Sequence, residues 1–411
     1  MNKKNFNQRR HNFSTFRQLC NYIPGFLVPQ LARATGVDKL CRSFSAWSHV
    51  VAMLYAQLTH SISLNDLCDS LGLHSGPLSA LRGATPPKRN TLSHANARRS
   101  AALAEQLFWA TLEHLGRLQP GFAGGRHPGR RRFRRAVHAV DATVIQLVAN
   151  CLDWAKHRRR KAAAKLQVRL NLQSLLPPCA VIHTAAEHEN TRAVEVCAGL
   201  AAGEVVIFDK AYVWFAHLWQ LTQRGVFWVS RPKDNLDYRV KRRKRPAGHV
   251  VRDEEIVLRG VKSGPAYPGV LRRVVVRITL DGQEQEMAFL TNQLAWSAQT
   301  IADLYRRRWE IEKFFRAIKQ TLQLGDFLGN SQNAVRWQVW TALLLYLLLR
   351  FQAFLSSWAG AFSRLWAVCR ALTWTRIDLL ALLRSCGTAG GTVRLRAEPA
   401  LGYLPGLAPK T

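Results

Sequence analysis

The order of strand and helix patterns between residues 136 and 232 limits the possible folds of this chain more than any other feature. Three apolar strands come first, and helices then alternate with further strands. In chain order the segments are strands at 136–147, 165–173 and 177–186, a helix at about 190–201, a strand at 204–208, a helix at about 212–223 and a strand at 225–232. This succession predicts an α/β fold built on a mixed sheet.

Other patterns flank this region and divide the chain. Residues 1–119 show helical periodicity and predict an all-α N-terminal domain, whereas 120–135 are rich in Gly, Pro and Arg and indicate a linker. We expect the α/β domain to span 136–385, with the short strand patterns at about 233–292 forming an all-β insertion within it. A long helix is predicted to begin near Ser297. Residues 386–411 are interpreted as a C-terminal tail.

One N-terminal segment, SLNDLCDSLGLHSGPLSALRG, has the outline of a helix–turn–helix. Gly72 would lie at its turn, with Arg82 and Lys88 nearby. A helical hairpin without a role in DNA binding fits the same pattern equally well.

The charge balance indicates a polyanionic partner. Lys and Arg number 59 against 26 Asp and Glu, a formal net charge of +33. Contacts with phosphates release condensed counterions, so nucleic acid is the favoured partner class. Basicity alone leaves DNA and RNA equally open, and a ribosome-associated or membrane-surface protein would show the same excess.

Several features favour a cytoplasmic protein that does not enter a membrane. The eight cysteines include no C-x-x-C pair, which argues against a disulfide framework or a zinc site and fits a reducing compartment. The first residues lack the apolar stretch of a signal peptide. The longest uncharged apolar run, between Gln338 and Arg350, is about half of what a bilayer crossing requires, so a buried helix is expected there.

Three acidic residues stand where carboxylates could work together. Asp141 interrupts an apolar strand, where a lone carboxylate would be costly unless paired or bound to metal, and Asp209 follows the apolar strand EVVIF. Glu312 belongs to a later amphipathic helix. Three carboxylates favour magnesium or manganese over zinc, and two such ions can promote in-line phosphodiester chemistry. Each Asp alone could equally be a strand-end cap or an ion-pair member.

The helix that carries Glu312 also aligns three other polar residues. At 100° per residue, Tyr305, Arg308, Glu312 and Lys319 fall within roughly a 60° arc beside an apolar stripe. An ordinary basic amphipathic helix with one Glu–Arg pair remains an equal alternative on this helix alone.

These residues resemble the motifs of a known enzyme family. The spacing Tyr305-x2-Arg308-x3-Glu312-x6-Lys319 is similar to the Y-R-E-K signature of DDE transposases in the insertion-sequence-four group. Asp141-Ala-Thr143 and Asp209-Lys-Ala-Tyr212 resemble that family's first-Asp and second-Asp motifs. The resemblance extends over roughly residues 25 to 350.

The resemblance implies a ribonuclease H-like catalytic domain in which Asp141, Asp209 and Glu312 bind two Mg²⁺ ions, with Mn²⁺ as a possible substitute. Tyr305, Arg308 and Lys319 would then hold phosphates of the transposon end. Further candidates for DNA contact, taken from their positions, are Trp309, which could stack on an unpaired base or pack on the insertion, and Lys165 and Arg169 on the second strand.

The expected function is cut-and-paste transposition of an insertion sequence. The enzyme would cleave the element ends and join them to target DNA, acting as a homodimer on two ends in the bacterial cytoplasm, associated with the nucleoid. Two alternatives remain. One is a DNA-binding transposition inhibitor without catalysis, and the other is a stand-alone magnesium-dependent nuclease.

Overall fold

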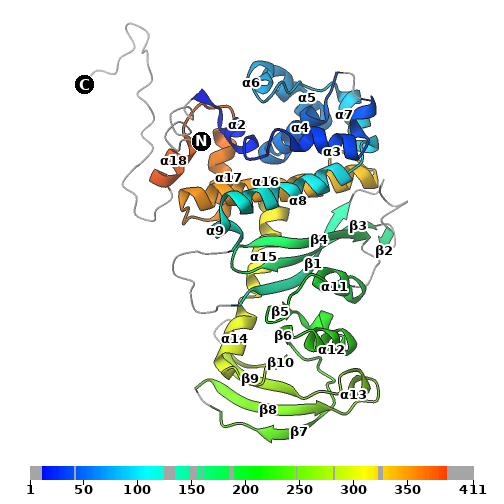
Figure 1. The fold of residues 1–411 in the computed structure, drawn as a ribbon, viewed down its shortest axis with the longest axis vertical. Helices are drawn as coiled ribbons and strands as arrows, with labels where there is room; N and C mark the ends of the chain where they lie inside the picture. Colours follow the sequence, from blue (N-terminus) through cyan, green and yellow to red (C-terminus); the bar gives the residue numbers. More distant parts are fainter. Residues whose placement is uncertain are drawn as a thin grey trace, which may run out of the picture.

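The structure is a computed structural model. It describes residues 12–40, 43–124, 135–147, 151, 156–158, 161–184, 189–246, 248–280, 283–322 and 327–386. Figure 1 shows a helical part from which a long sheet extends, with further helices along the sheet. The expected mixed α/β architecture with a helical N-terminal region is therefore confirmed. Most of the linker expected at 120–135 and all but the first residue of the tail expected at 386–411 lie outside the described residues.

The helical part combines segments from both ends of the described chain. From the N-terminal region it contains α2 (Thr15–Cys20), α3 (Leu27–Ala34), η2 (Val37–Leu40), α4 (Ala46–Thr59), α5 (Leu64–Leu73), α6 (Ser75–Ser79), α7 (Arg89–Arg98), α8 (Ala102–Leu118) and α9 (Pro120–Ala123). From the C-terminal region it contains α16 (Gln332–Ser356), α17 (Phe362–Ala371) and α18 (Leu379–Cys386). The turn expected at Gly72 lies instead at His74, because α5 continues to Leu73.

The helix α16 joins these two groups. It packs against α2, α4, α7 and α8 from the N-terminal region and against α17 and α18 (Figure 1). Among the described residues it is the one helix long and apolar enough to cross a membrane, but 83% of its most apolar window is buried within the protein. It is therefore the buried core helix of the helical part, as the apolar run after Gln338 predicts.

The sheet has ten strands. They are β1 (Val137–Leu147), β2 (Lys156–Arg158), β3 (Lys161–Asn171), β4 (Leu176–Thr184), β5 (Val205–Phe208), β6 (Phe227–Ser230), β7 (Tyr238–Arg243), β8 (Val250–Leu258), β9 (Leu271–Leu280) and β10 (Gln283–Thr291). Their order is β2-β3-β1-β5-β6-β10-β9-β8-β7, with β4 also paired to β3. The strands β1, β5 and β6 are parallel, and the other pairs are antiparallel.

The region 233–292 contains the four strands β7 to β10 and the four-residue helix α13 (Ser263–Ala266). It is thus mainly β and not purely β. Since β10 pairs with β6, these strands continue the same sheet. Figure 1 shows them at the end of the sheet farthest from the helical part.

Each face of the sheet is covered by different helices. The helices α11 (Glu189–Cys197) and α12 (Phe215–Gln223) pack on one face, around a core that includes Val140, Val206 and Phe208. The helices α14 (Ala298–Arg306) and α15 (Trp309–Arg316) lie on the other face, with the π-helical segment η5 (Ala317–Thr321) after them. Apolar residues on successive strand positions alternate between these two cores, as strand geometry requires.

Candidate active site

Two neighbouring parallel strands, β1 and β5, bring Asp141 and Asp209 side by side. Val140 on β1 is the register partner of Phe208 on the parallel strand β5, and the two aspartates are the next residues along each strand. Val140 and Phe208 both point into the core beneath α11 and α12, so both aspartates point to the opposite face, where α15 packs. The proximity expected from the sequence is therefore present.

The third acid comes from α15, but not from one continuous helix. The helix is interrupted at Arg307 and Arg308. Tyr305 therefore lies on α14, whereas Glu312 lies on α15. The prediction of a single helix is therefore wrong. Arg308 nevertheless keeps helical dihedral angles, φ −53° and ψ −32°, and its i,i+4 relation to Glu312 is preserved.

Arg308 connects the acids to one another. Its Nη2 donates a hydrogen bond to Glu312 Oε1 at 2.7 Å, and its Nη1 lies 3.8 Å from Asp141 Oδ2. The side chain is 17% exposed, so these ion pairs are only partly screened by water. Burial alone would lower the pKa of the guanidinium, but Tyr305 and three nearby carboxylates raise it overall. These carboxylates are Glu312, Asp209 and Asp141.

Tyr305 lies against the second aspartate. Its hydroxyl donates to Asp209 Oδ1 at 3.4 Å, and its ring packs on Phe289 of β10. Burial raises the pKa of Tyr305 to about 12, with Arg308 opposing the change. The phenol is therefore protonated at neutral pH and acts as a hydrogen-bond donor.

Lys319 approaches the site from η5. Its Nζ donates to Thr143 Oγ1 at 3.3 Å and to the Val144 carbonyl at 3.0 Å, both on β1 just beyond Asp141. Helix α4 holds the end of η5, since Gln57 donates to the Leu322 carbonyl and a ring nitrogen of His60 lies 2.8 Å from the Thr321 carbonyl oxygen. The helical part of the molecule thereby positions this lysine.

An open depression of about 290 Å³ lies where these elements meet. Residues 141–143 of β1 form one wall, and Glu312 and Lys319 lie on the other. Thr143 was not among the expected site residues, although it is part of the motif that contains Asp141. The depression is open to solvent and carries both acidic and basic groups, as a phosphodiester substrate with metal ions would require.

The chemistry of the donor set fits a hard divalent cation, because all three candidate ligands are carboxylates on neighbouring elements. In the arrangement of the described residues, no three His, Cys, Asp or Glu side chains are close enough together to hold a metal ion. The guanidinium of Arg308 pairs with Asp141 and Glu312, and Arg316 and Lys319 bring further positive charge to the depression.

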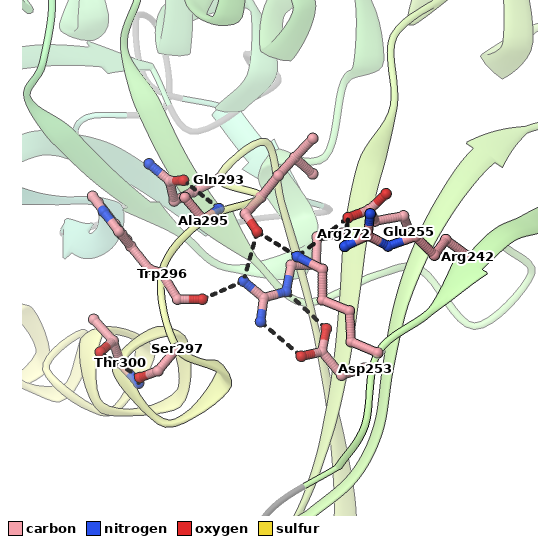
Figure 2. Close-up of polar contacts among 11 residues, drawn as sticks. Arg242, Asp253, Glu255, Arg272, Gln293, Ala295, Trp296, Ser297 and Thr300 are labelled. Carbon is pink, nitrogen blue, oxygen red and sulfur yellow. Dashed lines mark hydrogen bonds and ion pairs between the residues drawn. The ribbon is translucent and has the colours of Figure 1, made fainter.

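A buried ion pair fixes the start of α14 and thus Tyr305 (Figure 2). Arg272 of β9 donates from Nε and Nη2 to the two carboxylate oxygens of Asp253 on β8, both at 2.7 Å. Its Nη1 also donates to the carbonyls of Leu294, at 3.3 Å, and Trp296, directly before the α14 N-cap. The spacing of these two residues in the sequence does not predict the ion pair, because it forms only once β8 and β9 are paired.

Lys165 and Arg169 do not join the acids. On β3 they pair with Val144 and Val140, so their side chains point to the face opposite Asp141. Both are buried, at 7% and 6% exposure. They are therefore not positioned to contact a phosphate held beside the acids. Trp309 is 52% exposed on α15.

Carboxylates on neighbouring parallel strands, flanked by cations, define a class of site suited to phosphodiester chemistry. The family model described as "Transposase DDE domain" matches residues 132–348. The chain therefore belongs to the DDE transposase family, whose enzymes cleave DNA and transfer its strands. A second model, "Domain of unknown function (DUF4372)", matches residues 11–81.

Named relatives agree with this assignment. The chain is 33% identical to a putative transposase, y4zB, of Sinorhizobium fredii, over 65% of this chain and 72% of that protein. It is 30% identical to the probable transposase for insertion sequence element IS5377 of Geobacillus stearothermophilus, over 54% of this chain and 57% of that protein. The transposase InsG for insertion sequence element IS4 of Escherichia coli is 25% identical, over 46% and 43%.

Solved structures also match this chain. The cryo-EM structure of the piggyBac transposase synaptic complex with hairpin DNA aligns with a TM-score of 0.44 and 9% sequence identity. The alignment covers 92% of this chain and 83% of that chain. At this level of similarity it adds nothing to the assignment.

Proposed function

We propose that this DDE transposase acts through a ribonuclease H-like catalytic unit within residues 136–385, with 233–292 as its β-rich insertion. The strand order β4-β3-β1-β5-β6 supports this layout, because three antiparallel strands are followed by two that run parallel to β1. The N-terminal helices, within residues 1–119, would form the DNA-binding domain.

The observation that carries the proposal is the shared position of the acids. Asp141 and Asp209 follow one register pair on adjacent parallel strands, and Arg308 connects Asp141 to Glu312 on the facing helix. In this proposal the three carboxylates bind two magnesium ions, and manganese can substitute. Bound there, the ions would activate the attacking oxygen and stabilise the leaving oxygen.

The cationic and hydroxyl groups around the acids are proposed to hold the DNA backbone. Lys319 is exposed at the rim of the depression and can exchange its bonds to Thr143 and Val144 for a phosphate oxygen. Arg308 can pair with phosphate bidentately, and the protonated Tyr305 hydroxyl can donate to it. Trp309, with half of its surface exposed, is proposed to stack on an unpaired base at the cleaved end.

The overall reaction would begin with hydrolysis at each end of an insertion sequence, which frees a 3′ hydroxyl. That hydroxyl then attacks a target phosphodiester, so one bond forms as another breaks. We further propose that a homodimer holds both ends, and that the enzyme works in the bacterial cytoplasm, associated with the nucleoid.

The test is a cleavage and joining assay with purified full-length chain, magnesium and plasmid DNA carrying the sequences that flank its gene. Nicking at the element boundary followed by strand-transfer products is expected. Asp209→Asn should abolish both, whereas Asp303→Asn, which changes an exposed aspartate on α14, should not.

Each alternative gives a different result in this assay. Tight binding without cleavage in magnesium or manganese would replace the proposal with a non-catalytic inhibitor. Cleavage without any joined product would replace it with a stand-alone nuclease. Equal activity of Asp209→Asn and the wild type would refute the assignment of the site.

A further inference from the structure

The helical part carries a second depression, of about 530 Å³, well separated in sequence from the acids. Residues 35–37, after α3, form one side, and α7 forms the other, with Asn90, His94 and Arg98 among its lining side chains. No acidic residue lines it. A hollow with only neutral and cationic walls is suited to a polyanion.

Helix α7 has two distinct faces. Leu92, Ala95 and Asn96 are buried. Asn90, His94 and Arg98 follow one another at four-residue intervals, so they form one stripe along the helix, and all three are exposed. The sequence of α7, RNTLSHANAR, contains no Asp or Glu, so nothing on the helix would repel phosphates.

The buried face is held by polar contacts from two other helices. A ring nitrogen of His49 on α4 lies 2.8 Å from Asn96 Oδ1, and burial lowers the pKa of His49 to about 3, so the ring is neutral. Asn333 of α16 donates to the carbonyls of Asn96, at 2.9 Å, and Arg99, at 2.7 Å. Trp337 donates to the same Arg99 carbonyl at 2.7 Å. Helix α7 is thus held by its buried face, whereas its polar face is exposed.

We propose that α7 is the helix with which this protein reads the DNA of the element ends, by placing its exposed face along the major groove. The groove admits an α-helix, and Asn and Arg side chains form bidentate contacts with adenine and guanine edges. Asn90 and Arg98 would make these contacts, and Lys88 and Arg89 at the start of the helix would contact phosphates. This assignment rests on the proposed function, which supplies duplex DNA as the ligand.

The neighbouring hairpin of α5 and α6 is less suited to contact base edges, although its sequence resembles a helix–turn–helix. Its second helix, α6, has five residues, which leaves little length for base contacts. Its first helix, α5, exposes Asp66 and Asp69, which would face the phosphates unfavourably. Helix α7 is longer and free of acids.

The test uses the full-length chain without divalent metal, so that binding is measured without cleavage. Fluorescence anisotropy would give the affinity for a duplex with the terminal sequence that flanks the gene and for a scrambled duplex of equal length. The ratio of the two affinities measures sequence discrimination. Asn90→Ala and Arg98→Ala should each lower that ratio about tenfold. Arg117→Ala, an equal charge loss on the exposed surface of α8, should leave it unchanged.

The outcomes separate this inference from the proposed function. Since Asn90 and Arg98 are exposed, both variants should keep the circular dichroism spectrum and unfolding midpoint of the wild type. Unchanged discrimination, or an equal loss of affinity for both duplexes, would overturn the role of α7 while magnesium-dependent cleavage by the wild type still supports a transposase. A wild type that neither discriminates between the duplexes nor cleaves DNA would overturn both.

Discussion

Replacing Arg272 with methionine is expected to destabilise the protein by about 4 kcal/mol, because it leaves Asp253 as a buried carboxylate without its cation. The side chains of Arg272 and Asp253 are 3% and 7% exposed, so water cannot replace the lost partner. The carbonyls of Leu294 and Trp296 would also lose a donor. Removal of one partner from a buried ion pair typically costs about 3–5 kcal/mol.

Removing both charges should be milder than removing one. In the double variant Arg272→Met with Asp253→Leu, no uncompensated charge remains, and apolar side chains fill the space. We therefore expect the double variant to recover at least about 2 kcal/mol relative to Arg272→Met alone, a large non-additivity for two residues in contact.

Urea-induced unfolding, followed by circular dichroism, would measure these free energies. The matched control is the Arg252–Glu286 pair, at 3.2 Å, whose side chains are 52% and 46% exposed. Arg252→Met should cost less than about 1 kcal/mol, because exposed pairs contribute little. If Arg272→Met unfolds at the same urea concentration as Arg252→Met, or if the single and double variants are additive, the reasoning about the buried pair is refuted.

Three further predictions concern the site. Glu312→Gln should abolish magnesium-dependent cleavage while end DNA still binds with an affinity close to that of the wild type, and a gel-based assay with fluorescent ends measures both; normal cleavage would show that Glu312 is not a metal ligand. Lys319→Ala should reduce the slope of log binding constant against log salt by about one, measured by anisotropy titrations, and an unchanged slope would contradict the phosphate contact. In the absence of DNA, Arg308→Ala should raise the affinity for Mn²⁺ roughly tenfold, about 1.4 kcal/mol, because the guanidinium no longer pairs with Asp141 and Glu312. Electron paramagnetic resonance of free Mn²⁺ would measure this affinity. An affinity equal to that of the wild type would show that Arg308 does not compete with the metal ion for these carboxylates.

The sequence was sufficient to predict the two strands that carry the first two acids and the positions of Asp141 and Asp209 along them. Strand β1 covers Val137–Leu147 where 136–147 was expected, and β5 ends directly before Asp209 as expected. These features depend on local patterns of apolar residues, which determine where a strand runs and ends.

Features that depend on register or on distant packing were not predictable in this way. The side of the sheet on which Lys165 and Arg169 lie follows from their pairing with β1, and a shift of one residue would reverse it. The break between α14 and α15 falls within Tyr-Arg-Arg-Arg-Trp, where no Pro or Gly marks a helix end. Arg307, within this break, donates to the Leu172 carbonyl at 2.8 Å, and no local pattern of residues predicts such a contact.

The position of α16 has a consequence for shortened forms of the protein. A gene interrupted before residue 332 would encode the N-terminal helices without α16, the helix on which α4, α7 and α8 pack. Their apolar faces, Leu54, Phe108 and Leu115 among them, would then lose much of their cover. Such a product is expected to be degraded by cellular proteases before it can occupy element ends, so insertion-sequence copies cut short in this way should be inert and not dominant repressors.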